Sequence, residues 1–239
     1  MLLKDIKIIL CQASEGGNVG AICRVMKNMG LSELRLAAPQ SMDTEQICAR
    51  AVHARDMWEK ARIYNTLTEA AADCAVVVGA TRRRGRNRKS VSMTPRALAE
   101  WLARRSGPAA IVFGSERTGL EDSELDLCNI ASHIPVSDIQ PSLNLSHAVQ
   151  IYAYELFLAL EQQNPVKGEW QPMNQLEVSD LVGTITDTLA SLGFYKHPGR
   201  DEQAGFLRDV ISRAGLTERE GDYLKDIFAK AARLGRASC

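Results

Sequence analysis

The sequence lacks the features that assign many chains to a class at first sight. Its six cysteines include no C-x-x-C pair and its four histidines show no metal-ligand spacing, so we predict neither a metal site nor a disulfide framework. No apolar run approaches the roughly 20 residues of a membrane helix, which argues against a membrane protein. The 29 basic and 29 acidic residues balance, so any attraction for a polyanion must come from a local cluster of charge.

The composition that is present is ordinary for a soluble globular protein. The 239 residues are 45% hydrophobic and 24% charged, and they suffice for one large domain or for one domain with an appendage. Residues 1–11 alternate as a strand does and lack the apolar core and cleavage site of a signal peptide. We therefore expect a cytoplasmic location.

Short apolar runs rich in β-forming residues alternate with longer segments of helical period. The predicted strands are Ile6–Cys11, Leu34–Ala37, Ala75–Gly79, Ala109–Phe113 and Ile130–Pro135. A long apolar helix is predicted at Asn144–Leu160. This alternation predicts an α/β fold with a mainly parallel sheet flanked by helices, and such sheets bind ligands beyond the carboxyl ends of their strands.

A change in composition divides the chain. Residues 161–175 are polar and contain two prolines and a glycine, which is typical of a linker. Helical patterns follow at Glu177–Leu192, Asp201–Arg213 and Thr217–Leu234. Thr217 and Glu220 form a capping-box pattern at the start of the last helix. We predict a first domain at 1–163, a linker at 164–176 and a helical C-terminal extension at 177–239.

A glycine turn, GGNVG from Gly16, follows the first predicted strand. Aligned with a dinucleotide-binding fingerprint, it places Glu15 at the first glycine, where a carboxylate would oppose a pyrophosphate. A tight turn with Asn18 as the N-cap of a helix at Val19–Met29 explains the glycines as well as a functional turn does. Arg24 would be unremarkable in solvent, but at the ligand edge of the sheet it would need a partner.

The stretch Gly114–Glu121, GSERTGLE, has the glycine spacing of a phosphate-binding loop without its chemistry. Leu120 and Glu121 stand where a lysine and a hydroxyl would contact phosphate and Mg²⁺. A buried Glu116 could accept hydrogen bonds from a ribose or fix a neighbouring loop, whereas it would repel phosphate. The loop therefore suits an uncharged or cationic ligand.

A dense basic run comes directly after the predicted strand Ala75–Gly79. Its cations are Arg82, Arg83, Arg84, Arg86, Arg88 and Lys89. Such a run is often a solvated loop, but its place beside the expected ligand site also suits neutralisation of the phosphates of a polynucleotide. The predominance of arginine favours bidentate phosphate contacts and stacking on bases.

A third stretch, PSLNLSHA from Pro141, leads into the long predicted helix. Ser142 and Asn144 are both ordinary N-cap candidates. Capping explains one of the two residues and leaves the other unexplained.

Taken together, three segments resemble the ordered motifs of the SPOUT superfamily of RNA methyltransferases. They are NVGAICR from Asn18, FGSERTGLE from Phe113 and PSLNLSHAVQIYAYEL from Pro141. The resemblance covers residues 4 to 160 and is closest to bacterial members that methylate the ribose 2′-oxygen of cytidine or uridine at tRNA nucleotide 32. It implies a C-terminal trefoil knot, S-adenosylmethionine as cofactor, tRNA rather than DNA as partner, and a homodimer in which residues of the first motif face the partner's cofactor.

The resemblance also implies the roles of individual residues. It assigns catalysis to Arg24, surrounded by Asn18, Glu116, Ser142 and Asn144. It assigns cofactor contacts to Ala80, Thr81, Gly114, Ile134, Ser142, Leu143 and Asn144. Because a guanidinium loses its proton only far above neutral pH, a neutral guanidine would be costly, so we favour a charged Arg24 that holds phosphate and alkoxide, and we leave the base open. We expect the basic run to contact RNA and the C-terminal extension to dock tRNA.

Other functions fit parts of the pattern. The motifs build the cofactor site and not the RNA footprint, so the target could be another tRNA position or a ribosomal RNA. A non-catalytic RNA-binding dimer could keep the same fold, although the intact Arg24 and third motif argue against it. A dinucleotide-dependent enzyme is disfavoured by Glu15.

Overall fold

The computed structural model describes residues 1–82, 92–161, 171–195 and 199–237. The chain divides into two units, Met1–Gly168 and Glu169–Cys239, and each has a hydrophobic core of its own. No helix within the described ranges is long and apolar enough to cross a membrane.

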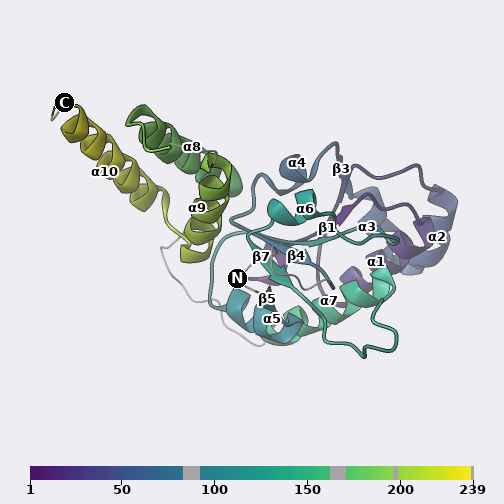
Figure 1. The fold of residues 1–239 in the computed structure, drawn as a ribbon. Coiled ribbons are helices and arrows are strands. Elements are labelled where there is room, and N and C mark those ends of the chain that lie inside the picture. The colour runs from purple at the N-terminus through teal and green to yellow at the C-terminus, as the bar shows by residue number, and fades with distance from the viewer. Residues whose placement is uncertain (83–91, 162–170, 196–198, 238–239) are drawn as a thin grey trace. The chain divides into compact units, whose positions relative to one another are not determined.

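One parallel sheet forms the centre of the first unit (Figure 1). Its strands are β1 (Ile6–Cys11), β2 (Glu33–Ala37), β3 (Arg62–Tyr64), β4 (Val76–Ala80), β5 (Ser92–Met93), β6 (Ala109–Phe113) and β7 (Ile130–Ser132). Their order is β3-β2-β1-β6-β4-β7-β5, and every neighbouring pair is parallel. Phe113, at the end of β6, pairs with Leu10 on one side and with Ala80 on the other. The carboxyl ends of β1, β4 and β6 therefore meet at one edge, and the predicted α/β class is confirmed, while the trefoil knot stays a prediction.

Five strands were expected, and the sheet contains all five of them. Strands β1 and β6 have the predicted bounds, whereas β2 begins one residue earlier, β4 runs one residue later and β7 ends at Ser132 rather than Pro135. The sequence does not predict β3 or β5. These edge strands have three and two residues, and Ile63 in β3 is exposed, so neither has enough buried positions to produce a periodic signal.

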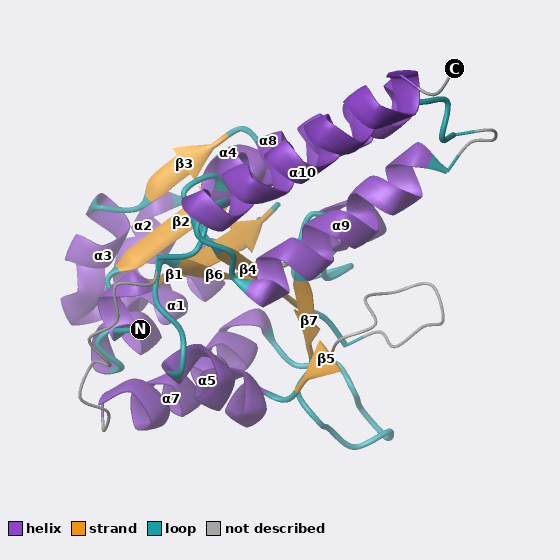
Figure 2. Ribbon diagram, turned by 90° about the vertical axis from the view of Figure 1, so that its left-hand side faces the viewer, coloured by secondary structure: helices purple, strands orange, loops and turns teal. Residues whose placement is uncertain are grey.

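Helices cover both faces of the sheet (Figures 1 and 2). Those of the first unit are α1 (Gly16–Asn28), α2 (Thr44–Ala51), α3 (Arg55–Glu59), α4 (Leu67–Ala71), α5 (Pro95–Ala103), α6 (Asp122–Asp126) and α7 (Leu145–Glu161), with single 3-10 turns at Leu3–Asp5 and Val52–Ala54. The buried residues of α1, α2, α3, α5 and α7 pack on one face, and those of α4 and α6 pack on the other. Coverage of both faces explains why the central strands read as continuous apolar runs.

The first helix begins earlier than the sequence predicts. Helix α1 starts at Gly16 with Glu15 in the N-cap position, so the predicted start at Val19 and the N-cap role of Asn18 are wrong. Asn18 lies in the first turn, where it is 8% exposed. Its side chain is directed at other side chains, described below, rather than at the free amides of its own helix.

The second unit consists of three helices in its described part. They are α8 (Gln175–Ser191), α9 (Arg200–Ala214) and α10 (Glu218–Ala237). Helix α8 packs against both of the others, and Val178, Leu181 and Ile185 on α8 lie in the core of this unit. All three predicted helices are therefore present, and the predicted domain limits stay predictions.

Two capping boxes define helix starts in the second unit. Helix α8 begins two residues before the predicted position because Asn174 and Glu177 cap it reciprocally. The predicted capping box at the start of α10 is confirmed, since the Glu220 carboxylate accepts from the Thr217 amide at 2.7 Å and Thr217 Oγ1 accepts from the Glu220 amide at 3.4 Å.

Candidate active site

The turn Gly114–Gly119 after β6 is held together by its own backbone and hydroxyl groups. The Gly119 amide donates to the Ser115 carbonyl oxygen at 3.0 Å, and the Ser115 and Thr118 hydroxyls lie 2.8 Å apart. Gly119 has a φ of +69°, and a Cβ on Gly114 would lie 2.0 Å from the carbonyl carbon of Gly119. Close backbone approach therefore explains both glycines without a phosphate.

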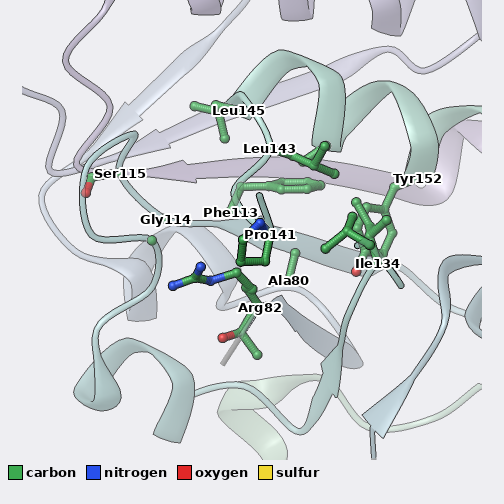
Figure 3. Close-up of a pocket in the computed structure, with 14 residues that line it drawn as sticks. Ala80, Arg82, Phe113, Gly114, Ser115, Ile134, Pro141, Leu143, Leu145 and Tyr152 are labelled. Carbon is green, nitrogen blue, oxygen red and sulfur yellow. The ribbon is translucent and has the colours of Figure 1, made fainter. Parts of the chain in front are cut away.

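This turn forms one side of a pocket at the carboxyl ends of β4 and β6 (Figure 3). The segments after β4 and β6, the loop after β7 and helix α7 all contribute to it. The described residues that line the pocket are Ala80, Thr81, Arg82, Phe113, Gly114, Ser115, Gly119, Ile134, Val136, Pro141, Leu143, Leu145, Ala148 and Tyr152. The pocket lies where a parallel sheet is expected to bind its ligand.

Most of the predicted cofactor contacts lie in this wall. Ala80, Thr81, Gly114, Ile134 and Leu143 all line the pocket. The other two predicted contacts, at positions 142 and 144, flank Leu143 and are exposed, and neither is among the described lining residues.

The wall is largely apolar. Phe113, Pro141 and Leu143 lie across its middle in Figure 3, with Gly114 at one side and Tyr152 at the other. Arg82 is the one charged side chain among the described residues that line it. Such a wall suits a flat ring with an aliphatic chain, and the arginine could pair with a carboxylate of the ligand.

Glu116 fixes a neighbouring loop, which is one of the two roles that the sequence leaves open for it. Its carboxylate accepts from the Ser14 amide at 3.3 Å, from the Ser14 hydroxyl at 3.1 Å and from the Glu15 amide at 3.3 Å. The side chain is half-buried rather than buried. Glu116 therefore joins the turn after β6 to the turn after β1.

Asn18 connects these two turns to the third motif. Its Nδ2 lies 3.3 Å from the Glu116 carboxylate and 3.0 Å from that of Glu15. Its Oδ1 accepts from Asn144 Nδ2 at 3.0 Å. The side-chain oxygen of Asn144 accepts from the amide of Ser146 at 2.8 Å, so Asn144 is the residue that caps the start of α7. One chain of hydrogen bonds thus joins all three motifs.

The start of α1 is a poor site for phosphate. Two carboxylates, those of Glu15 and Glu116, converge there on the Asn18 amide group. Their negative charge opposes the attraction that a helix N-terminus otherwise has for anions. A dinucleotide at this turn is accordingly disfavoured by the geometry as well as by the sequence.

Arg24 lies outside this cluster of hydrogen bonds. It is on the exposed face of α1 and is not among the described residues that line the pocket. Ile22, Cys23 and Met26, which are close to it in sequence, are buried on the other side of the helix. The described part of the chain therefore does not bring Arg24 to the pocket of the same chain.

The basic run is described at one position. Arg82 lines the pocket and follows directly after the predicted cofactor contact Thr81. The remaining predicted RNA contacts, Arg83, Arg84, Arg86, Arg88 and Lys89, lie outside the described residues.

The sequence does not assign Phe113 or the apolar side chains of α7 to a ligand site. Leu145, Ala148 and Tyr152 share one face of α7, and a helical apolar face predicts core packing. The same face both packs and lines the pocket. Phe113 carries a positional signal, because it is the last residue of a central strand and stands directly before the glycine turn.

Comparison with solved structures defines the class of the fold. TrmJ from Z. mobilis ZM4 matches with a TM-score of 0.77 and 30% sequence identity, covering 94% of this chain and 98% of that chain. The parallel sheet flanked by helices is accordingly the SPOUT fold of RNA methyltransferases.

Residues 5–154 match the SpoU rRNA methylase family, and the chain belongs to this family. A tRNA (cytidine/uridine-2′-O-)-methyltransferase TrmJ from Salmonella choleraesuis is 36% identical over 237 residues, which is 95% of this chain and 96% of the relative. A tRNA (cytidine-2′-O-)-methyltransferase TrmJ from Methanocaldococcus jannaschii is 38% identical over 176 residues, which is 73% of this chain and 74% of the relative. The family resemblance carried by the three motifs is confirmed.

Proposed function

We propose that this protein methylates the ribose 2′-oxygen of cytidine or uridine at nucleotide 32 of tRNA, with S-adenosylmethionine as methyl donor, in the cytoplasm. The observation that carries the proposal is the hydrogen-bonded chain from Glu116 through Asn18 to Asn144, which joins three distant motifs beside one pocket. Similarity over nearly the full length to a relative named a tRNA (cytidine/uridine-2′-O-)-methyltransferase supports it.

The chemistry of the pocket fits S-adenosylmethionine. Phe113, Ile134 and Leu143 provide apolar surface for an adenine ring and an aliphatic chain. Arg82 provides a cation for the carboxylate of the methionine moiety. The carboxylate of Glu116 is directed at Ser14, Glu15 and Asn18 and thereby organises the loops around the ligand.

When bound, S-adenosylmethionine would supply the methyl group of its sulfonium to the ribose 2′-oxygen, and the rest of the cofactor would leave as S-adenosylhomocysteine. A ribose hydroxyl is a poor nucleophile, so a protein group must stabilise the negative charge that develops on its oxygen. We assign this task to a charged Arg24. Its planar guanidinium can donate to the RNA phosphate and to the developing alkoxide at the same time, which a point charge does less well.

We also propose a homodimer in which Arg24 acts at the pocket of the partner subunit. The proposal rests on the exposure of Arg24 and on its place outside the described pocket wall of its own chain. A second copy, related by a twofold axis, would supply the arginine to each pocket reciprocally.

Two further surfaces are assigned to RNA. The basic residues that follow Arg82 would neutralise phosphates, while Arg82 itself is assigned to the cofactor carboxylate. The helical extension would dock tRNA, and its exposed Phe206 and Tyr223 are side chains that can stack on bases.

A chain truncated after Gln163 should keep its cofactor affinity while its KM for tRNA rises at least about tenfold. Unchanged tRNA affinity would contradict the docking role.

The first experiment is transfer of labelled methyl from S-adenosylmethionine to unmodified tRNA by the parent protein and by Arg24→Ala. Nuclease digestion and mass spectrometry would locate the methylated ribose. Methyl at nucleotide 32 that is lost in Arg24→Ala would support both the activity and the role of Arg24. Methyl at another ribose would keep the reaction and change the target.

A parallel melting experiment separates the cofactor site from the reaction. S-adenosylmethionine should raise the Tm of the parent protein, because a ligand that binds the folded state stabilises it. A raised Tm without methyl transfer to any tRNA would contradict the proposed substrate and leave the pocket assignment intact.

A further inference from the structure

A fully buried serine below the pocket connects three elements of the sheet and helix layers. Ser132 ends β7, and its carbonyl oxygen accepts from the amide of Thr81 at 2.8 Å. Its hydroxyl donates to the carbonyl oxygen of Met93 in β5 at 2.8 Å and accepts from the hydroxyl of Tyr152 in α7 at 2.8 Å. Thr81 is itself part of the pocket wall, so this serine links that wall to β5 and α7.

Tyr152 is the member of this group that reaches both the pocket and the serine. Its side chain is 1% exposed and lines the pocket beside Ile134 (Figure 3). Its ring meets that of Phe113 edge to face, with centroids 5.4 Å apart and planes at 82°. A phenylalanine could make the same ring contacts, so packing alone does not explain the hydroxyl.

The hydroxyl is placed to work as a hydrogen-bond donor. Burial raises the pKa of Tyr152 well above its ordinary value, so the group keeps its proton at any physiological pH. A buried hydroxyl without a partner would be costly, and here the partner is the serine that also fixes Thr81 and Met93. The cost of burying the phenol is therefore offset by its bond to the hydroxyl of Ser132, whose backbone carbonyl holds Thr81.

We propose that Tyr152 is a positioning residue for the cofactor, whose hydroxyl acts through Ser132 to hold the pocket wall at Thr81 in its binding geometry. The inference rests on the proposed function, because it takes the pocket to be the S-adenosylmethionine site. It goes beyond that function by assigning cofactor affinity to a buried polar connection between Tyr152, which lies in the third motif, and Ser132, which lies outside all three motifs.

The test is calorimetric titration of S-adenosylmethionine into the full chain, comparing the parent with Tyr152→Phe. Loss of one internal hydrogen bond should weaken binding by about threefold to tenfold. At saturating cofactor, kcat and the KM for tRNA should stay within about twofold of the parent, because the hydroxyl is directed at buried Ser132 and away from solvent. Tyr154→Phe is the matched control, since Tyr154 lies two positions along the same helix and is 48% exposed.

A double-mutant cycle tests the route through the serine. If the phenol acts through Ser132, then Ser132→Ala combined with Tyr152→Phe should bind the cofactor no more weakly than Ser132→Ala alone. Additive losses would overturn the proposal, because the tyrosine would then act independently of the serine.

Two other results would also overturn it. Cofactor affinity in Tyr152→Phe equal to that of the parent, together with a lower Tm, would show that the bond serves stability alone. Absence of cofactor binding by the parent itself would refute the proposed function and the inference with it, and this outcome is distinct because the parent is measured in the same series.

Discussion

At the residue scale, the geometry of the guanidinium of Arg24 should matter as much as its charge. Arg24→Lys keeps the cation and loses the planar fork, so kcat should fall by about a hundredfold, the usual cost of losing an aligned donor to developing negative charge. The measurement is single-turnover methyl transfer at saturating tRNA and cofactor. Arg104→Lys is the control, since Arg104 is an exposed arginine at the end of α5. Near-full activity of Arg24→Lys would show that a generic cation suffices.

A second residue-scale prediction concerns stability in acid. The hydrogen bond from buried Arg35 lowers the pKa of Asp73 from 3.8 to about 2. A carboxyl whose pKa is lower in the folded state than in the unfolded state stabilises the fold at any pH above its unfolded-state pKa. This stabilisation is lost as the pH falls through its folded-state pKa. Because the Asp73 side chain is 58% exposed, solvent screening limits this contribution to about 1 kcal/mol.

Asp73→Asn should therefore lower the unfolding free energy by about 1 kcal/mol at pH 7. The difference between parent and variant should narrow as pH falls from about 4 to about 2, as measured by urea denaturation. A difference that is the same at both ends of this range would show that the ion pair does not carry the effect.

At the element scale, the packing of α1 against α2 depends on a glycine. A Cβ on Gly20 would lie 2.3 Å from the carbonyl oxygen of Ile47, whereas one on Gly17 would have its nearest neighbour at 3.8 Å. Gly20→Ala should lower the unfolding free energy by about 1–3 kcal/mol through overpacking. Gly17→Ala, three residues earlier in the same helix, should stay within about 0.5 kcal/mol of the parent or gain stability. Equal stability of the two variants would refute the close approach.

The same scale shows which elements a sequence can predict. The central strands β1 and β6 are buried on both faces, so each reads as an apolar run with clear ends, and both have the predicted bounds. The edge strands β3 and β5 form because a neighbouring strand provides hydrogen-bond partners for their backbones. Their own sequences, of three and two residues, are too short to indicate this pairing. Asn18 has the side chain of an N-cap, but contacts with residues about a hundred positions away set its role.

The candidate site also has features that the sequence predicts and features that it does not. The glycine turn after β6 and its lack of phosphate chemistry are readable from the residues alone, and the resemblance supplies the family. The convergence of Asn18, Glu116 and Asn144 depends on the pairing of β1 with β6 and on the packing of α7 against α1, which local patterns do not specify. Tyr152 reads as a core residue because the helix face that packs on the sheet also lines the pocket.

At the scale of the whole molecule, the proposed homodimer predicts complementation between two inactive chains. One chain carries Arg24→Ala and keeps its pocket. The other carries Leu143→Asp, which places a charge in the apolar pocket wall at a position that is 39% exposed, and keeps its arginine. If Arg24 acts at the partner's pocket, a mixed dimer has one complete site, formed by the intact pocket of the first chain and the arginine of the second.

Random pairing should make about half of the dimers mixed, each with one of its two sites complete, so mixing should restore about a quarter of the parent's activity. Denaturing and refolding the two variants together, with each refolded alone as control, provides the measurement. If Arg24 instead acts at its own pocket, every chain in the mixture carries a disabled site and activity should stay at the level of the separate variants. Both arrangements predict that each variant is inactive by itself, so only the mixed sample distinguishes them. Failure of rescue would place the catalytic arginine at the pocket of its own chain.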